Sequence, residues 1–107
     1  MNAFRETTYL SEILEKSNTE PVIIFKYSET CSSSSRTKNE LEKWTEAKNI
    51  LVPIYIVTVQ KHKSLSGNIA ELFNTKHESP QILIINKQKL VYTAHHNEIN
   101  SEKFVFQ

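Results

Sequence analysis

The chain has 107 residues, a formal charge of +1 at pH 7, 38% hydrophobic residues and one cysteine. This length suits one domain spanning residues 1–107, and the near-neutral charge argues against nucleic-acid binding, which needs a basic surface. The longest mostly apolar stretch, residues 50–59, is about half of the roughly 20 residues that a membrane-spanning helix needs. No secretory signal is visible at the start, so we expect a cytoplasmic protein with a free thiol.

The first elements are a helix and a strand. Apolar residues recur at the spacing of one helical face between Thr7 and Ser17, which predicts a short leading helix. Asn18–Pro21 interrupts this pattern. Val22–Phe25 is a β-branched and aromatic run without polar alternation, as expected of a central strand covered on both faces.

The next element is an amphipathic helix. Leu41, Trp44 and Ala47 follow one another at three-residue steps with charged residues between them, which predicts a helix over Ser33–Lys48 that packs on the sheet. Because Trp44 shares this apolar face, we expect it to pack in the core rather than to stack on a ligand.

The second half continues the alternation. A strand is predicted at Ile54–Val59 and a helix at Ser64–Asn74. Gln81–Ile85 and Leu90–Ala94 flank a polar turn, as in a hairpin, and Ser101–Phe106 is compatible with a closing helix.

The order of these elements predicts an α/β fold of the thioredoxin-like class. In that architecture two parallel strands come first, and an antiparallel hairpin completes a four-stranded mixed sheet covered by helices. The order supports this assignment more than any single boundary does.

The single thiol, Cys31, lies between the end of the first strand and the start of a helix. Open α/β sheets bind ligands beyond the carboxyl ends of their strands, often at a helix N-terminus. The helix dipole stabilises a thiolate there and lowers its pKa. Arg36 and Lys38 in the first turns also favour an anion at this point, although a buried, inert cysteine remains the alternative.

A serine run follows the cysteine. Serine is a preferred helix cap, and capping explains part of this run. Ser34, however, stands three residues after Cys31, where a Cys-x-x-Cys oxidoreductase has its resolving thiol. A mixed disulfide on Cys31 must therefore await an outside thiol, and the Ser34 hydroxyl is a candidate hydrogen-bond donor to the thiolate.

Pro80 directly precedes the hairpin, in the segment His77–Gln81. Position alone favours a trans peptide, because about 5–6% of X-Pro bonds in folded proteins are cis. Thioredoxin-like proteins, however, place a cis-proline here, facing the active cysteine, and the backbone before it pairs with an extended substrate.

Several segments together resemble the monothiol bacilliredoxins, the YtxJ-like family, over nearly the whole chain. The segments that carry the resemblance are Phe25–Ser28, Thr30, Cys31, Ser34, Glu78–Gln81, Ala94, His96, Glu98 and Ile99. The chain departs from the family pattern at Ser32 and Ser33, where proline and an aliphatic residue are usual, and at Asn97, where tryptophan is usual.

The resemblance implies a thiol–disulfide oxidoreductase that removes bacillithiol from protein mixed disulfides under oxidative stress. Cys31 would be the nucleophile, Pro80 the cis-proline and Ser34 the replacement for a resolving cysteine. The implied partners are bacillithiol as co-substrate, bacillithiolated proteins and a flavin-dependent reductase, with no cofactor. Because bacillithiol carries a malyl group with two carboxylates, Lys26, Arg36 and Lys76 are candidate charge partners. Thr30 and Ser79 are further candidate ligand contacts.

Two other functions stay open at this point. One is an iron–sulfur protein of the monothiol glutaredoxin type, although such proteins have glycine after the cysteine and the only glycine here is Gly67. The other is a redox-inert interaction domain. The four histidines, His62, His77, His95 and His96, do not form a recognised zinc pattern, so no metal site is predicted.

Overall fold

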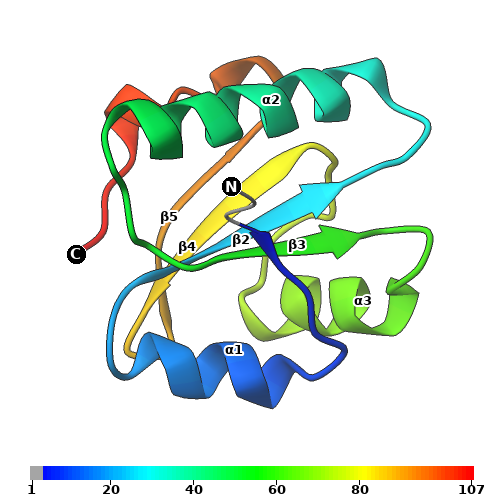
Figure 1. Ribbon diagram of the computed structural model, residues 1–107. Helices are drawn as coiled ribbons and strands as arrows, with labels where there is room; N and C mark the ends of the chain where they lie inside the picture. Colours follow the sequence, from blue (N-terminus) through cyan, green and yellow to red (C-terminus); the bar gives the residue numbers. More distant parts are fainter. Residues whose placement is uncertain (1–3) are drawn as a thin grey trace.

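The computed structural model describes residues 4–107 as one mixed sheet with helices on both faces (Figure 1). The elements in chain order are β1 (Phe4–Arg5), α1 (Leu10–Ser17), β2 (Val22–Tyr27), α2 (Ser32–Ala47), β3 (Ile54–Thr58), α3 (Lys63–Leu72), β4 (Gln81–Asn86), β5 (Lys89–His95) and the short 3₁₀ turns η1 (His96–Glu98) and η2 (Ser101–Lys103). From α1 to β5, each boundary lies within three residues of the sequence prediction.

The sheet has the strand order β1-β3-β2-β4-β5. β2 pairs in parallel with β3, β4 pairs antiparallel with β2, and β5 completes the hairpin. This arrangement confirms the two parallel strands and the antiparallel hairpin expected from the sequence. The four-strand expectation missed β1, whose two residues pair with Ile54 and Tyr55 and are too few to produce a periodic pattern.

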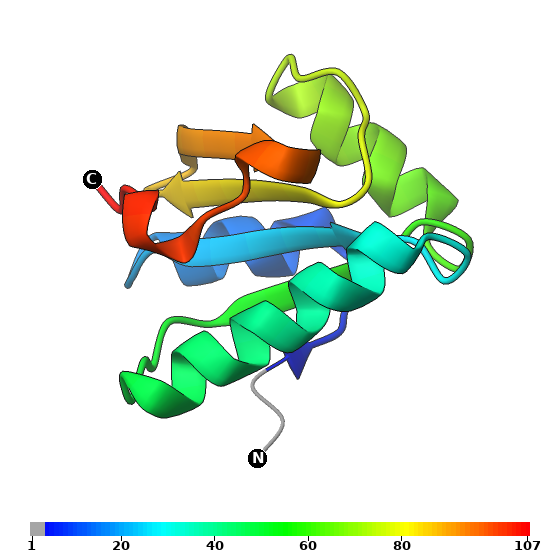
Figure 2. The same ribbon diagram turned by 90° about the horizontal axis from the view of Figure 1, so that it is seen from above.

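The two faces of the sheet carry separate cores. α1 and α3 cover one face, and α2 with the C-terminal segment covers the other (Figures 1 and 2). Along β2, Val22 and Ile24 belong to the core under α1 and α3, whereas Ile23 and Phe25 belong to the core under α2. Burial on both faces explains why β2 reads as a continuous apolar run.

The apolar face of α2 differs from the expected one. Its buried residues are Ser34, Thr37, Leu41 and Thr45, while Ala47 is exposed. Successive three-residue steps turn by about 300° in a helix, so a row of such steps drifts off any one face, whereas mixed three- and four-residue steps stay on it.

The C-terminal segment is not the helix considered for Ser101–Phe106. After η2 the chain is extended, and this two-residue period turns Phe104 and Phe106 to the same side, against Trp44. The Trp44 and Phe104 ring centroids are 5.4 Å apart in an edge-to-face arrangement. The prediction that Trp44 packs in the core is confirmed.

The β4–β5 turn uses two left-handed residues that are not glycine. Lys87 and Gln88 have φ values of 51° and 65°. Both amides donate to Ser17 at the end of α1, one to its carbonyl at 2.8 Å and one to its hydroxyl at 3.0 Å. The other residues with positive φ are Asn49, Asn74 and His96, so none of the left-handed positions within residues 4–107 is glycine.

Within residues 4–107, none of the helices combines the length and the apolar character needed to cross a membrane.

Candidate active site

Cys31 stands at the junction of β2 and α2, at the carboxyl end of the central strand. It is the N-cap of α2 and is partly exposed. Its carbonyl accepts hydrogen bonds from the backbone N–H groups of Ser34 and Ser35, at 3.1 and 3.3 Å, which start the helix. The free N–H groups of the first helical turn therefore lie around the thiol.

The pKa of the Cys31 thiol lies below its ordinary value. The main cause is the hydrogen bond from the backbone N–H of Ser34, and the hydroxyls of Ser33 and Ser34 act in the same direction. Desolvation is the second-largest effect and acts in the opposite direction, raising the pKa without cancelling the hydrogen bonds. The lowered pKa favours the thiolate, which is the nucleophilic form of cysteine.

Ser34 fixes the loop before the cysteine as well as lowering the thiol pKa. The residue is completely buried, and its Oγ accepts the backbone N–H of Ser28 at 3.1 Å. One small side chain thus contacts both the thiol and the end of β2.

Gln60, which the sequence analysis did not single out, also holds this loop. Its Nε2 donates to Ser28 Oγ at 2.8 Å, and its Oε1 accepts the backbone N–H of Glu29 at 3.1 Å. Its Nε2 also lies 3.5 Å from Thr30 Oγ1. Gln60 follows β3, and the carboxyl ends of parallel neighbours meet at one edge of a sheet, so the strand order was the available signal.

Pro80 has the expected cis peptide bond with Ser79, which confirms that prediction. Pro80 is buried and Ser79 partly buried. Because Lys26 pairs with Gln81, the start of β4 lies beside the end of β2, and Pro80 is at the same end of the sheet as Cys31. The carbonyl of Pro80 accepts the backbone N–H of His96 at 3.0 Å.

Lys26 is buried rather than at the surface, where its candidate role as a ligand contact would place it. Its side chain has no exposed area, and its Nζ donates to the carbonyl of Ser66 at 3.0 Å and lies 3.2 Å from His77 Nδ1. Burial lowers its pKa to about 8. The pKa of His77 is also lowered, first by desolvation and then by the charge of Lys26. Lys26 thereby joins β2 to α3 and to the segment before Pro80.

A groove of about 180 Å³ lies beside the first turns of α2. Ser33 and Arg36 line one side, and His96 and Asn97 of η1 line the other. Arg36 is exposed and is the one candidate ligand contact that lines this groove. The remaining candidates lie outside its lining: Thr30, Lys76 and Ser79.

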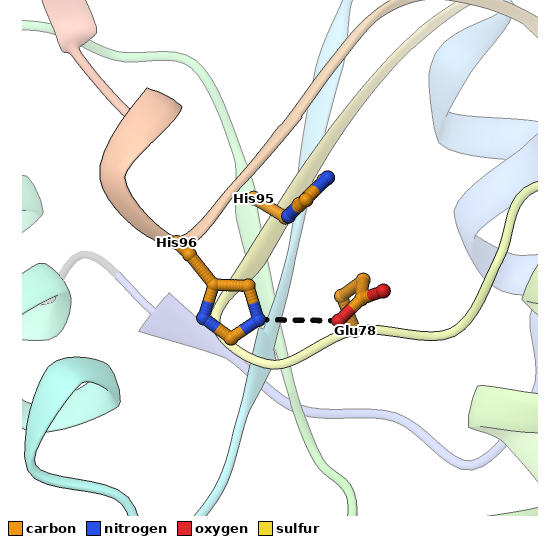
Figure 3. A group of neighbouring side chains, drawn as sticks. All are labelled: Glu78, His95 and His96. Atoms are coloured by element: carbon orange, nitrogen blue, oxygen red, sulfur yellow. Dashed lines mark hydrogen bonds and ion pairs between the residues drawn. The ribbon is translucent and has the colours of Figure 1, made fainter.

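Lys76 and Glu78 flank the segment that leads to Pro80. The Lys76 ammonium is highly exposed and lies 3.7 Å from the Glu78 carboxylate. Glu78 also accepts a hydrogen bond from His96 Nε2 at 3.1 Å, with His95 close by (Figure 3). The pKa of Glu78 is lowered, first by this hydrogen bond from His96.

Solved structures share the overall fold of this chain. A protein described as an oxidoreductase with a thioredoxin fold is 26% identical with a TM-score of 0.82, over 94% of this chain and 88% of that one. The thioredoxin of Malassezia sympodialis is 12% identical with a TM-score of 0.70, over 89% and 82%. Thioredoxin f from spinach chloroplasts is 17% identical with a TM-score of 0.68, over 86% and 80%. The thioredoxin-like fold is thus confirmed.

The family comparison covers almost the whole chain. The model of the family described as "Monothiol bacilliredoxin BrxC" matches residues 2–104, which include the thiol, the serine three residues later and the cis-proline. Together with the fold of an oxidoreductase, this match supports a function in thiol–disulfide redox chemistry. The chain belongs to the monothiol bacilliredoxin family.

Proposed function

We propose that this protein removes bacillithiol from protein mixed disulfides in the cytoplasm through Cys31. The observation that carries the proposal is a partly exposed cysteine with a lowered pKa at the N-terminus of α2, with serine at the resolving position. The family match supports bacillithiol as the co-substrate.

The exchange needs no cofactor. The Cys31 thiolate attacks the bacillithiol sulfur of the modified protein, a new sulfur–sulfur bond forms, and the old bond breaks with its electron pair on the protein sulfur. The target protein leaves as a thiolate that takes up a proton from water. Cys31 then carries bacillithiol, and the number of disulfides is unchanged.

Resetting the protein needs a second thiol from outside. The Ser34 hydroxyl cannot attack the mixed disulfide as a thiolate would, so free bacillithiol attacks the bound one, which regenerates the Cys31 thiolate and releases bacillithiol disulfide. A flavin-dependent reductase that reduces this disulfide would complete the cycle.

The groove beside α2 is the proposed site for the malyl carboxylates. Arg36 offers a planar guanidinium suited to a carboxylate, and it follows Cys31 by five residues in the first turns of α2. Thr30 and Lys76, which do not line this groove, remain candidate contacts for the rest of the ligand. The backbone at Ser79 is the proposed place where an extended protein substrate pairs. Lys26 takes part by holding the segment before Pro80.

The test is direct. The reduced protein is mixed with a bacillithiolated test protein, and the masses of both are followed without added reductant. We expect the test protein to lose one bacillithiol and this protein to gain one, while Cys31→Ser transfers nothing. A parallel substrate carrying glutathione measures specificity, and equal transfer from both substrates would contradict a preference for bacillithiol. A colourless purified protein would also be expected, because an iron–sulfur cluster absorbs visible light.

A further inference from the structure

Glu78, His95 and His96 form a cluster that takes no part in the proposed exchange step, although His96 also lines the groove beside α2. One ligand atom from each side chain lies within 4.8 Å of the others (Figure 3). Glu78 is distant in sequence from the two histidines. It precedes β4, whereas His95 ends β5 and His96 begins η1. Pairing of His95 with Gln81 brings the two segments together.

The backbone takes an unfavourable conformation where the two rings meet. Neighbouring residues of a strand point to opposite faces, which would separate the rings. His96 instead has φ of 51°, in the left-handed region, and its ring centroid lies 5.3 Å from that of His95 at an interplanar angle of 90°. A left-handed residue other than glycine costs about 1–2 kcal/mol, so the surrounding contacts must hold it in place.

We propose that Glu78, His95 and His96 bind a divalent cation of the zinc type. Two imidazoles and one carboxylate are a ligand set that suits Zn²⁺, with a further position left for water. Two ligand atoms about 2.1 Å from a tetrahedral ion are separated by about 3.4 Å. The 3.1 Å between His96 Nε2 and Glu78 Oε1 already approaches this separation. Rotation of the partly exposed His95 ring would bring one of its nitrogens closer to these two atoms.

The hydrogen bonding of the two rings is compatible with this role. Within the described part of the chain, His95 Nδ1 is buried and makes no hydrogen bond of full geometry, although the His95 side chain faces the backbone N–H of Glu98 in the capping arrangement at the start of η1. Its Nε2 lies 3.6 Å from Glu98 Oε1. His96 would coordinate through Nε2 with its proton on Nδ1, so the ion replaces the present hydrogen bond to Glu78. The Glu98 carboxylate would compete with the ion for the His95 ring, so Glu98 is not one of the proposed ligands.

The cation would lie beside the cis-proline. His96 donates its backbone N–H to the carbonyl of Pro80, and Glu78 is two residues before that proline. None of the three ligands is a sulfur atom, so the site is separable from Cys31 by mutation.

The experiment is a calorimetric titration of the reduced full chain with Zn²⁺, supported by the visible spectrum of Co²⁺ in its place. We expect one ion per chain, and each of Glu78→Gln, His95→Gln and His96→Asn should weaken binding at least about tenfold, which is the low end for losing even an outer partner of a metal site. Asparagine is chosen at position 96 because it tolerates a left-handed backbone.

Three matched variants serve as controls. Cys31→Ser and His62→Gln should each retain wild-type affinity, and Glu98→Gln should bind Zn²⁺ at least as tightly as the wild type because it removes the competing carboxylate. The Co²⁺ spectrum should lack the sulfur charge-transfer absorption of a thiolate ligand. No Zn²⁺ binding by the wild type, binding that survives all three ligand substitutions, or binding lost with Cys31→Ser would overturn the proposal. The last result would leave the exchange function unaffected, because that function is tested by transfer of bacillithiol.

Discussion

The acidity of Cys31 depends on groups that belong to the first turn of α2. The backbone N–H of Ser34 is the main one, and it is fixed by the start of the helix, whereas the Ser33 hydroxyl is a replaceable side-chain contact. The effects of backbone and side chain can therefore be separated by mutation.

We expect alkylation of Cys31 by iodoacetamide to have a pH midpoint below about 8.5, the value of a free cysteine. Because the folded pKa is lowered, the thiolate persists to lower pH and reactivity is lost as pH falls through the lowered value. Ser33→Ala removes a stabilising hydroxyl and should raise the midpoint. Ser35→Ala, at an exposed position of the same turn, should leave it unchanged, and a wild-type midpoint at the free-cysteine value would refute this account.

Restoring a second thiol should change how the mixed disulfide is resolved. In Ser34→Cys the new thiol can attack the bacillithiolated Cys31, close an internal disulfide and expel bacillithiol. After loading and without reductant, mass spectrometry should show the wild type keeping its adduct and the variant falling two hydrogens below its reduced mass.

Ser34→Ala is the matched control for that exchange, because it also removes the hydrogen bond to the Ser28 N–H but supplies no thiol. It should keep the adduct as the wild type does. If the wild type lost its bacillithiol adduct as fast as Ser34→Cys does, resolution of the mixed disulfide would not need a second cysteine. That result would contradict the monothiol mechanism.

For single residues, the sequence predicted the roles of some and missed those of others. The position of Cys31 before a helix and the spacing to Ser34 are local, so the pattern alone indicated them. Gln60 and the buried ammonium of Lys26 depend on contacts 32 and 40 residues away in sequence, with Ser28 and Ser66. Glu78 and His96 meet across 18 residues, which no metal-ligand spacing rule describes.

At the scale of elements, the C-terminal segment is held to α2 by alternate aromatic residues. Phe104 packs edge-to-face on Trp44 and also contacts the ring of Tyr92, with ring centroids 5.8 Å apart. Val105, between the two phenylalanines, is 45% exposed. The segment therefore has one packed side and one exposed side.

We expect Phe104→Ala to lower the free energy of unfolding by about 2–4 kcal/mol, because it removes a large, partly buried ring from the core under α2. Val105→Ala, one residue away on the exposed side, should change it by less than about 0.5 kcal/mol. Urea denaturation of both variants measures the difference. Equal effects would show that the segment is not docked through its aromatic side.

The same segment shows where prediction of elements fails. A helix over Ser101–Phe106 was plausible from the local pattern, but contact with the distant Trp44 favours an extended chain that places two phenylalanines on one side. The central strands were predictable because burial on both faces leaves an unbroken apolar run. β1 was not, because its two residues are strand only by pairing with β3.

At the scale of the whole molecule, the buried Lys26 links stability to pH. Its pKa is about 8 in the folded protein and about 10.4 in an unfolded chain. Between these values the unfolded state binds more protons, so stability should rise as pH increases from about 8 to about 10. Below the lower value both states are protonated and the cost of burying the charge is fully present.

We expect this rise to be on the order of 1–3 kcal/mol in the wild type and to be absent from Lys26→Met, which has a side chain of similar length without charge. Chemical denaturation across this pH range measures it. Lys48→Met, at an exposed lysine after α2, should keep the wild-type slope. His77 contacts the ammonium but is neutral throughout this range, since its pKa is lowered. If the free energy of unfolding of Lys26→Met rose with pH as steeply as that of the wild type, groups other than Lys26 would be responsible for the rise.

The left-handed positions described above are sites where a substitution by glycine would raise the thermal stability of the protein. Among residues 4–107, five residues adopt positive φ without being glycine. The turn residues Lys87 and Gln88 adopt it in succession, and their backbone amides, not their side chains, make the contacts to Ser17. Glycine at Gln88 would relieve the steric cost and retain that amide contact. A scaffold for engineered thiol exchange could therefore gain heat tolerance at the end of the sheet farthest from Cys31, with its reactive chemistry left untouched.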